Sequence, residues 1–190
     1  MSRPRTFIGL ATLALCSITY AVAPALQGMV QAAPQHNMIQ QGTGEWAGTV
    51  TMYMEGQAST APCSEVVASI GDLWTTSRFE MEFMGTTFTG ASTLGYDPAK
   101  KKFVGTWIDN GHPTLTVMEG TYDEAKKAIV MHYDGMDDMT GTMKKMRQET
   151  THTKNSYTMK FFKVEGGADK LEMEMTLNRK ASTTEAASGR

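Results

Sequence analysis

The sequence predicts an all-β domain in which about ten antiparallel strands follow one another as an up-and-down meander and close into a barrel. Two observations predict this class. Between residues 44 and 180, segments rich in Thr, Val, Tyr, Phe and Trp alternate apolar and polar positions with a period of two. Turn signals such as Asp97-Pro98 and Gly166-Gly167 separate these segments roughly every 10–15 residues.

The predicted strands each have one apolar face. In the last strand, four apolar residues occupy the odd positions: Leu171, Met173, Met175 and Leu177. In the first strand, the even positions are apolar or glycine: Trp46, Gly48, Val50, Met52 and Met54. A meander buries such a face by closing on itself, which also removes its unpaired edges. A two-layer sandwich is the alternative architecture.

Residues at the two ends of the domain favour closure. Gly44 and Trp46 open the first strand, and Arg179 ends the last one on its apolar face. Closure makes these two strands neighbours, so both side chains point inward near one end of the barrel. We therefore expect the Arg179 guanidinium to stack on the Trp46 indole and to donate to free backbone carbonyls there. This pair, with Gly44, resembles the signature of the calycin superfamily, which includes lipocalins.

A longer set of motifs resembles one bacterial family of proteins of unknown function, the family numbered 1579. The motifs are Gly44–Val50, Phe88–Gly90, Thr93–Pro98, Val104–Asp109, Met118–Asp123, Met139–Gly141 and Lys145–Arg147. The resemblance extends from about Gly44 to Lys180 and implies a domain. It implies neither an activity nor any catalytic residue.

The N-terminal residues predict a secretory signal peptide over residues 1–32. Arg3 and Arg5 precede an apolar run that extends from Phe7 to about Ala25. Cleavage after Ala32 makes Ala33 the first mature residue, in the periplasm or outside the cell. An uncleaved membrane anchor is the alternative, because ~20 apolar residues span a bilayer. After cleavage we expect no stable membrane insertion.

The remaining boundaries follow from composition. Residues 33–43 are polar without a period, which predicts a linker; residues 44–180 form the barrel domain, and 181–190 a disordered tail. Lys and Arg number 18 against 20 Asp and Glu, so losing Arg3 and Arg5 takes the net charge from −2 to −4. No basic stripe remains for nucleic acid. Cys63 is then the single cysteine, and we expect it to be a buried free thiol.

Candidate ligands for a metal or haem are scattered. If the hairpin around residues 136–141 folds about Asp138, His132 and His152 lie ~27 Å apart, too far to share a metal. Four methionines form a local cluster whose thioethers suit Cu(I): Met136, Met139, Met143 and Met146. Methionine is also an adaptable core residue, which is the simpler interpretation.

The sequence contains no catalytic or cofactor motif. Its leading functional hypothesis is a non-enzymatic, lipocalin-like barrel that holds one small apolar ligand and no cofactor. The alternatives are an enzyme of unrecognised mechanism, a copper- or haem-binding periplasmic protein, and a partner-binding module. Titratable residues that converge in the barrel mouth would favour an enzyme.

Overall fold

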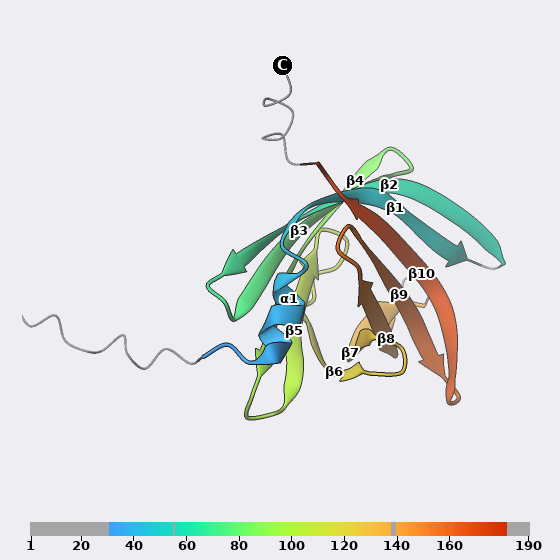
Figure 1. Ribbon diagram of the computed structural model, residues 1–190. Helices are drawn as coiled ribbons and strands as arrows, with labels where there is room; N and C mark the ends of the chain where they lie inside the picture. Colours follow the sequence, from blue (N-terminus) through green and yellow to red (C-terminus); the bar gives the residue numbers. More distant parts are fainter. Residues whose placement is uncertain (1–30, 55, 138–139, 182–190) are drawn as a thin grey trace, which may run out of the picture. The chain divides into compact units, whose positions relative to one another are not determined.

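A computed structural model describes residues 31–54, 56–137 and 140–181, which form one helix and ten strands (Figure 1). The elements are α1 (Pro34–Gln40), β1 (Gly44–Met54), β2 (Gln57–Ile70), β3 (Trp74–Phe83), β4 (Thr86–Asp97), β5 (Lys102–Asp109), β6 (Thr116–Asp123), β7 (Ala128–Asp137), β8 (Thr142–His152), β9 (Ser156–Glu165) and β10 (Ala168–Arg179). All of these elements belong to one compact unit.

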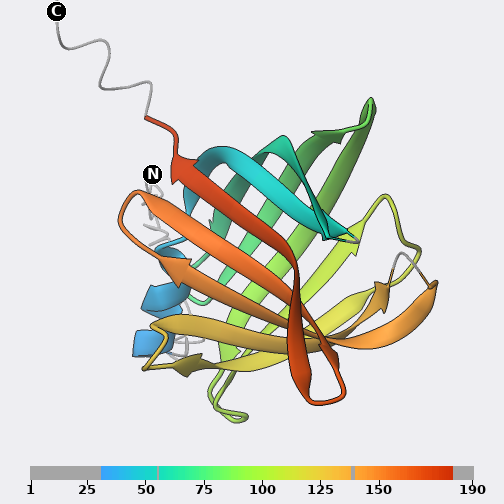
Figure 2. The same ribbon diagram turned by 90° about the vertical axis from the view of Figure 1, so that its right-hand side faces the viewer.

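The strands form a closed antiparallel barrel, which confirms the predicted fold class. Each strand pairs with its neighbours in the chain, and β1 pairs with β10 to close the sheet (Figure 2). This closing seam runs in one register from the pair Trp46 and Arg179 to the pair Met52 and Met173. No strand is therefore left with an open edge along its whole length.

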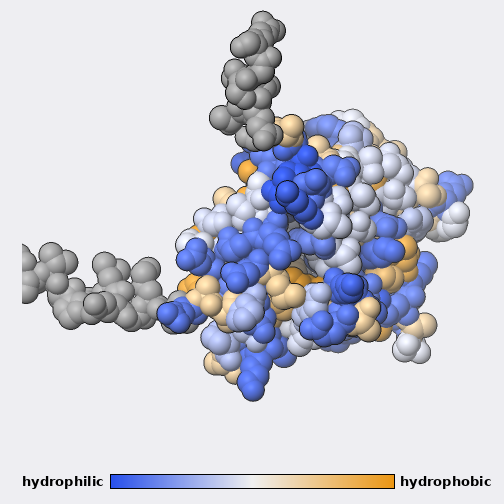
Figure 3. Space-filling model, in the orientation of Figure 1, coloured by the Kyte–Doolittle hydropathy of each residue, from blue (hydrophilic) through white to orange (hydrophobic). Residues whose placement is uncertain are grey.

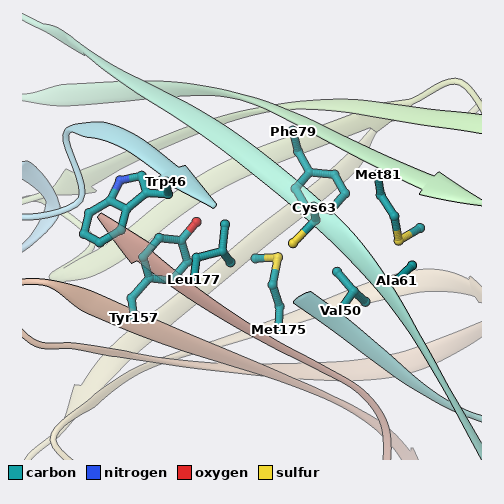
Figure 4. Close-up of a cluster of buried hydrophobic side chains, with 9 residues drawn as sticks. All are labelled: Trp46, Val50, Ala61, Cys63, Phe79, Met81, Tyr157, Met175 and Leu177. Atoms are coloured by element: carbon teal, nitrogen blue, oxygen red, sulfur yellow. The ribbon is translucent and has the colours of Figure 1, made fainter. Parts of the chain in front are cut away.

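The barrel interior holds two apolar clusters. Residues from β1, β2, β3, β9 and β10 form the larger one (Figure 4), whose buried members are Trp46, Val50, Ala61, Cys63, Phe79, Met81, Tyr157, Met175 and Leu177. The smaller one joins α1 to β5 and β7 through Ile39, Phe103, Ile129 and Met131. The alternation predicted for the first strand is confirmed, because its apolar positions Trp46 and Val50 belong to the larger cluster.

The structure corrects the linker predicted over residues 33–43, because Pro34–Gln40 form helix α1. Pro34 begins the helix, and the backbone N–H of Ala33 donates to His36 Nδ1 at 2.8 Å. Ile39 is only 3% exposed because it packs in the smaller cluster. Seven residues are too few to display helical periodicity, and contacts with the barrel stabilise such a short helix.

The structure also corrects the face predicted for Leu171. Leu171 pairs with Phe162 whereas Met173 pairs with Phe161, so the register shifts by one residue at a bulge in β10. Phe161 and Phe162 are adjacent and point to opposite faces. Leu171 therefore lies on the outer face and Glu172 on the inner one, the reverse of the alternation in the sequence.

Two predicted segments lie outside the described residues: the signal peptide, apart from residues 31 and 32, and the tail, apart from Ala181. In the part of the chain that the structure describes, no helix has the length and apolar character needed to cross a membrane.

Candidate functional site

Arg179 stacks on Trp46 at the closing seam, as the sequence predicts. The guanidinium carbon lies 4.0 Å from the centroid of the indole ring. Its nitrogens donate to the backbone carbonyls of Thr43 at 2.6 Å, Gln41 at 2.9 Å and Lys154 at 3.2 Å. Gly44 has a φ of 132°, a conformation that favours glycine, and a Cβ there would lie 2.5 Å from an Arg179 nitrogen. The pair closes one end of the barrel.

A chain of hydrogen bonds crosses the barrel interior next to this closed end. Tyr157 on β9 donates its hydroxyl to Glu65 on β2, and Ser77 on β3 also bonds to that carboxyl. Ser77 in turn shares a 2.7 Å hydrogen bond with Ser92 on β4. Glu65 is only 6% exposed, and its burial raises the pKa of the carboxyl well above its usual range.

The rest of the interior, towards the opposite end, is lined by methionine and aromatic side chains. According to the strand registers, eight of these side chains face inward, and all eight are only half-buried: Met52, Phe88, Trp107, Met118, Met146, Met159, Phe161 and Met173. These apolar side chains keep part of their surface exposed, and most of them pack against the two buried clusters. This half-buried apolar wall, which we call the lumen, is the candidate binding site.

Charged residues converge at the open end of the lumen. Lys163 lies 3.1 Å from Asp137 and 3.2 Å from Glu172. Hydrogen bonds to these carboxylates raise the pKa of Lys163, so its ammonium group stays charged. Nearby Tyr133 has its pKa raised by burial and by Glu172. A charged lysine and a protonated tyrosine are poor bases and nucleophiles.

A groove of about 780 Å³ runs along β6 to β10, lined mostly by residues of the outer face together with Tyr133 and Met146 of the inner face. Its charged side chains are already paired: Arg147 with Asp169, Lys145 with Asp134, and Glu119 with lysines at positions 100 and 102. The Arg147 guanidinium also stacks on Phe162. These charges satisfy one another, and the groove is an ion-paired strand surface.

The structure keeps the histidines of the predicted hairpin apart. His132 pairs with Arg147, so the turn lies later than the predicted centre at Asp138 and the two histidines are closer along the strands than expected. The two histidines nevertheless lie on opposite faces of the sheet. His132 shares the face of its partner Arg147, and Arg147 and His152 are an odd number of positions apart on β8. Elsewhere, the His112 ring bonds to Asp109 at 3.0 Å in the loop after β5.

The methionine cluster proposed for copper does not converge. Met136 pairs with Met143 on the outer face, whereas Met146 pairs with Tyr133 on the inner face. Met139 lies outside the described residues. Within residues 31–54, 56–137 and 140–181, no group of three His, Cys, Asp or Glu side chains is arranged to hold a metal ion.

The sequence reasoning missed Glu65 as an interior residue. Its signal is the alternation of β2, in which the inward positions are Ala61, Cys63, Glu65 and Val67. An acid at an apolar position of a strand indicates a buried carboxyl. The neighbouring prediction, a buried free thiol at Cys63, is confirmed.

Comparison with known proteins identifies a solved structure with a similar fold and a matching protein family. The S-type phycobiliprotein lyase CpeS from Guillardia theta is similar in structure, with a TM-score of 0.54 and 11% identity over 78% of this chain and 93% of that chain. At this identity the likeness shows the fold alone. The comparison with curated proteins finds none that matches. The model of a family described as protein of unknown function, DUF1579, matches residues 31–179. The chain therefore belongs to the DUF1579 family.

Proposed function

We propose that this protein is an exported, non-enzymatic barrel that carries one small apolar ligand in its lumen. The observation that carries the proposal is the wall of half-buried methionine and aromatic side chains that face inward. Methionine adapts its shape to irregular ligands, and aromatic rings supply large apolar contacts. Small barrels hold single ligands in this way.

The overall arrangement of the barrel supports carriage. One end is closed by Arg179 and Trp46, and α1 packs on the smaller cluster. Figure 3 shows hydrophobic residues beside α1, at this closed end of the barrel. A phycobiliprotein lyase uses a barrel of the same fold, although the fold by itself assigns no activity.

Native mass spectrometry tests the ligand. The protein is purified from its host and sprayed under gentle and then denaturing conditions. We expect a mass above that of the polypeptide that is lost on unfolding, and we expect extraction to recover an apolar molecule. Repeated purification of a bare polypeptide, from cells grown in several media, contradicts the proposal.

Export is tested separately. It is supported by the basic residues Arg3 and Arg5 and the apolar run that follows them. N-terminal sequencing of the protein from a periplasmic fraction is expected to begin at Ala33. An intact Met1 in the membrane fraction contradicts export with cleavage.

An enzyme is the second candidate, and the charged cluster of Lys163, Asp137 and Glu172 at the open end is the observation that favours it. Lys163→Met distinguishes the two functions. A carrier with this substitution still binds its ligand, with altered rates of entry and release, because the lumen wall is unchanged. An enzyme that uses Lys163 loses turnover while it retains binding.

A further inference from the structure

Glu65 lies on the inner face of β2 with apolar neighbours on both sides. It pairs with Trp46 across one strand boundary and with Phe79 across the other. Both aromatic side chains are buried in the larger cluster, and Glu65 itself is only 6% exposed. A carboxyl in such surroundings opposes stability, and groups of this kind concentrate at functional sites.

The groups around Glu65 supply no countercharge. Cys63 is on the same strand, Ser77 is on β3 and Tyr157 on β9, and all three are uncharged at neutral pH. The His152 ring centre lies 5.2 Å from that of Tyr157, and burial followed by the charge of Arg179 lowers the pKa of the histidine. Within the described residues, no lysine or arginine forms an ion pair with Glu65.

Arg179, the cation that stacks next to Glu65's neighbour Trp46, is already engaged. Arg179 stacks on Trp46 and donates to three backbone carbonyls. Its guanidinium therefore completes the closed end of the barrel. In the protein by itself a proton neutralises the buried carboxyl, and a countercharge that would hold Glu65 ionised has to come from a molecule that enters the lumen.

The surroundings of Glu65 suit an organic cation. The ring centroids of Phe88 and Trp107 lie 6.3 and 6.2 Å from that of Phe79, next to Glu65 in the sheet. Aromatic faces attract ammonium groups, and the effect is strongest away from water. Ser92, Gln148 and Met159 are only half-buried on the lumen side, which leaves the Glu65 hydrogen-bond chain open to a ligand. At the open end, Asp137 and Glu172 already pair with Lys163, so Glu65 is the carboxyl that a cation in the lumen would meet without a positive partner.

We propose that the lumen binds an amphipathic organic cation, a protonated amine joined to an apolar skeleton, and that Glu65 is its counter-ion. The proposal rests on the ligand-carrying function above and specifies its ligand class. The ammonium group meets the carboxyl beside Tyr157 and Ser77. The apolar skeleton extends along the methionine and aromatic wall towards the open end.

A matched pair of ligands tests the proposal: octylamine, which is charged at pH 7.5, and octanol, which has the same chain and no charge. Isothermal titration calorimetry measures both with the full mature protein. We expect both to bind, and octylamine to bind at least about tenfold more tightly, because only the ammonium group can pair with the Glu65 carboxylate, whose proton passes to solvent on binding. This comparison in the unmodified protein requires no variant to fold.

Two variants locate the effect. Glu65→Gln keeps the size of the side chain and removes its charge, so octylamine should fall to the affinity of octanol while octanol is unaffected. Glu80→Gln is the matched control, because Glu80 lies on the outer face of β3 with half of its side chain exposed. It should leave both affinities unchanged. Circular dichroism and retained octanol binding show that each variant folds.

The outcomes separate this inference from the proposed function. Equal affinity for the two ligands in the unmodified protein overturns the cation inference and leaves an apolar carrier. Preference for octylamine that persists in Glu65→Gln also overturns it, because another group then supplies the charge. Failure of both ligands to bind overturns the inference together with the apolar carrier on which it rests.

Discussion

Tyr157 reaches across the barrel interior from β9 to donate its hydroxyl to Glu65 on β2, although the two residues are 92 positions apart in the chain. The edge of the Tyr157 ring also packs on Trp46, with centroids 4.8 Å apart. One phenol thus links the buried carboxyl to the residue that closes the barrel. The buried carboxyl of Glu65 and the closed end of the barrel are therefore connected through the side chain of Tyr157.

Glu65 makes stability depend on pH. Its pKa is raised in the folded state, so the folded protein binds more protons than the unfolded chain above the usual pKa of a glutamate. The resulting contribution to the free energy of unfolding is fully present below the pKa of Glu65 in the unfolded chain. It is lost as pH rises through the higher pKa of the folded state. Glu65→Gln removes this titration and keeps an acceptor for Tyr157. We expect its melting temperature, relative to the unmodified protein, to be higher at pH 8 than at pH 4.

The same pH series checks that Glu65 is the group responsible for this pH dependence. Glu80→Gln should track the unmodified protein at every pH, because Glu80 is exposed and paired with Arg78. A Glu65→Gln protein with the same pH slope as the unmodified one contradicts the assignment to Glu65.

Trp46 and Arg179 should behave as one interaction. Arg179→Ala removes a cation–π contact of about 0.5–2 kcal/mol and the part-buried hydrogen bond to the Thr43 carbonyl, worth about 1 kcal/mol. We expect a loss of several degrees in melting temperature. Trp46→Ala should cost as much or more, because it empties a buried aromatic site. The double variant should lose less than the sum, since the two residues share one contact.

The control for this cycle is Arg78→Ala, which removes an arginine from the outer face whose side chain is 74% exposed. It should change the melting temperature little, both alone and combined with Trp46→Ala. Strict additivity of Trp46→Ala and Arg179→Ala would show that the stacked contact contributes nothing to stability.

Gly48 permits the close approach of β1 and β10. A Cβ at this position would lie 2.0 Å from the Thr176 carbonyl oxygen and 2.8 Å from the Leu177 Cα, both of which are backbone atoms. The backbone has to move to admit it, so Gly48→Ala should destabilise the protein by about 3 kcal/mol. Urea unfolding measures the loss, with the exposed Thr49→Ala on the same strand as the control. Equal midpoints for the two variants would contradict the steric argument.

Cys63 should be an inert thiol in the folded protein. It is buried, and burial followed by the charge of Glu65 raises its pKa to about 11. Thiolate is the reactive form, so a disulfide reagent at pH 8 should label the native protein very slowly. Labelling should become fast in guanidinium chloride. Rapid labelling of the native protein would place the thiol in contact with solvent.

The sequence by itself determined the class of fold and the way in which the barrel closes. An alternation of two residues is a property of each strand alone, so the inward positions of β1 and β3 follow from local pattern. Trp46 and Arg179 lie at opposite ends of the domain, and parity at both ends predicts their contact. Closure then follows, because a meander has one way to bury one face without exposed edges.

Only the tertiary structure decided the features that depend on distant partners. Helix α1 is too short to show a period, and Ile39 stabilises it by packing against the barrel. The bulge at Leu171 inverts the local alternation, and pairing with β9 reveals it. The site itself depends on Tyr157, which meets Glu65 across the interior. Such a contact depends on strand order and on the reach of two side chains, neither of which a local pattern encodes.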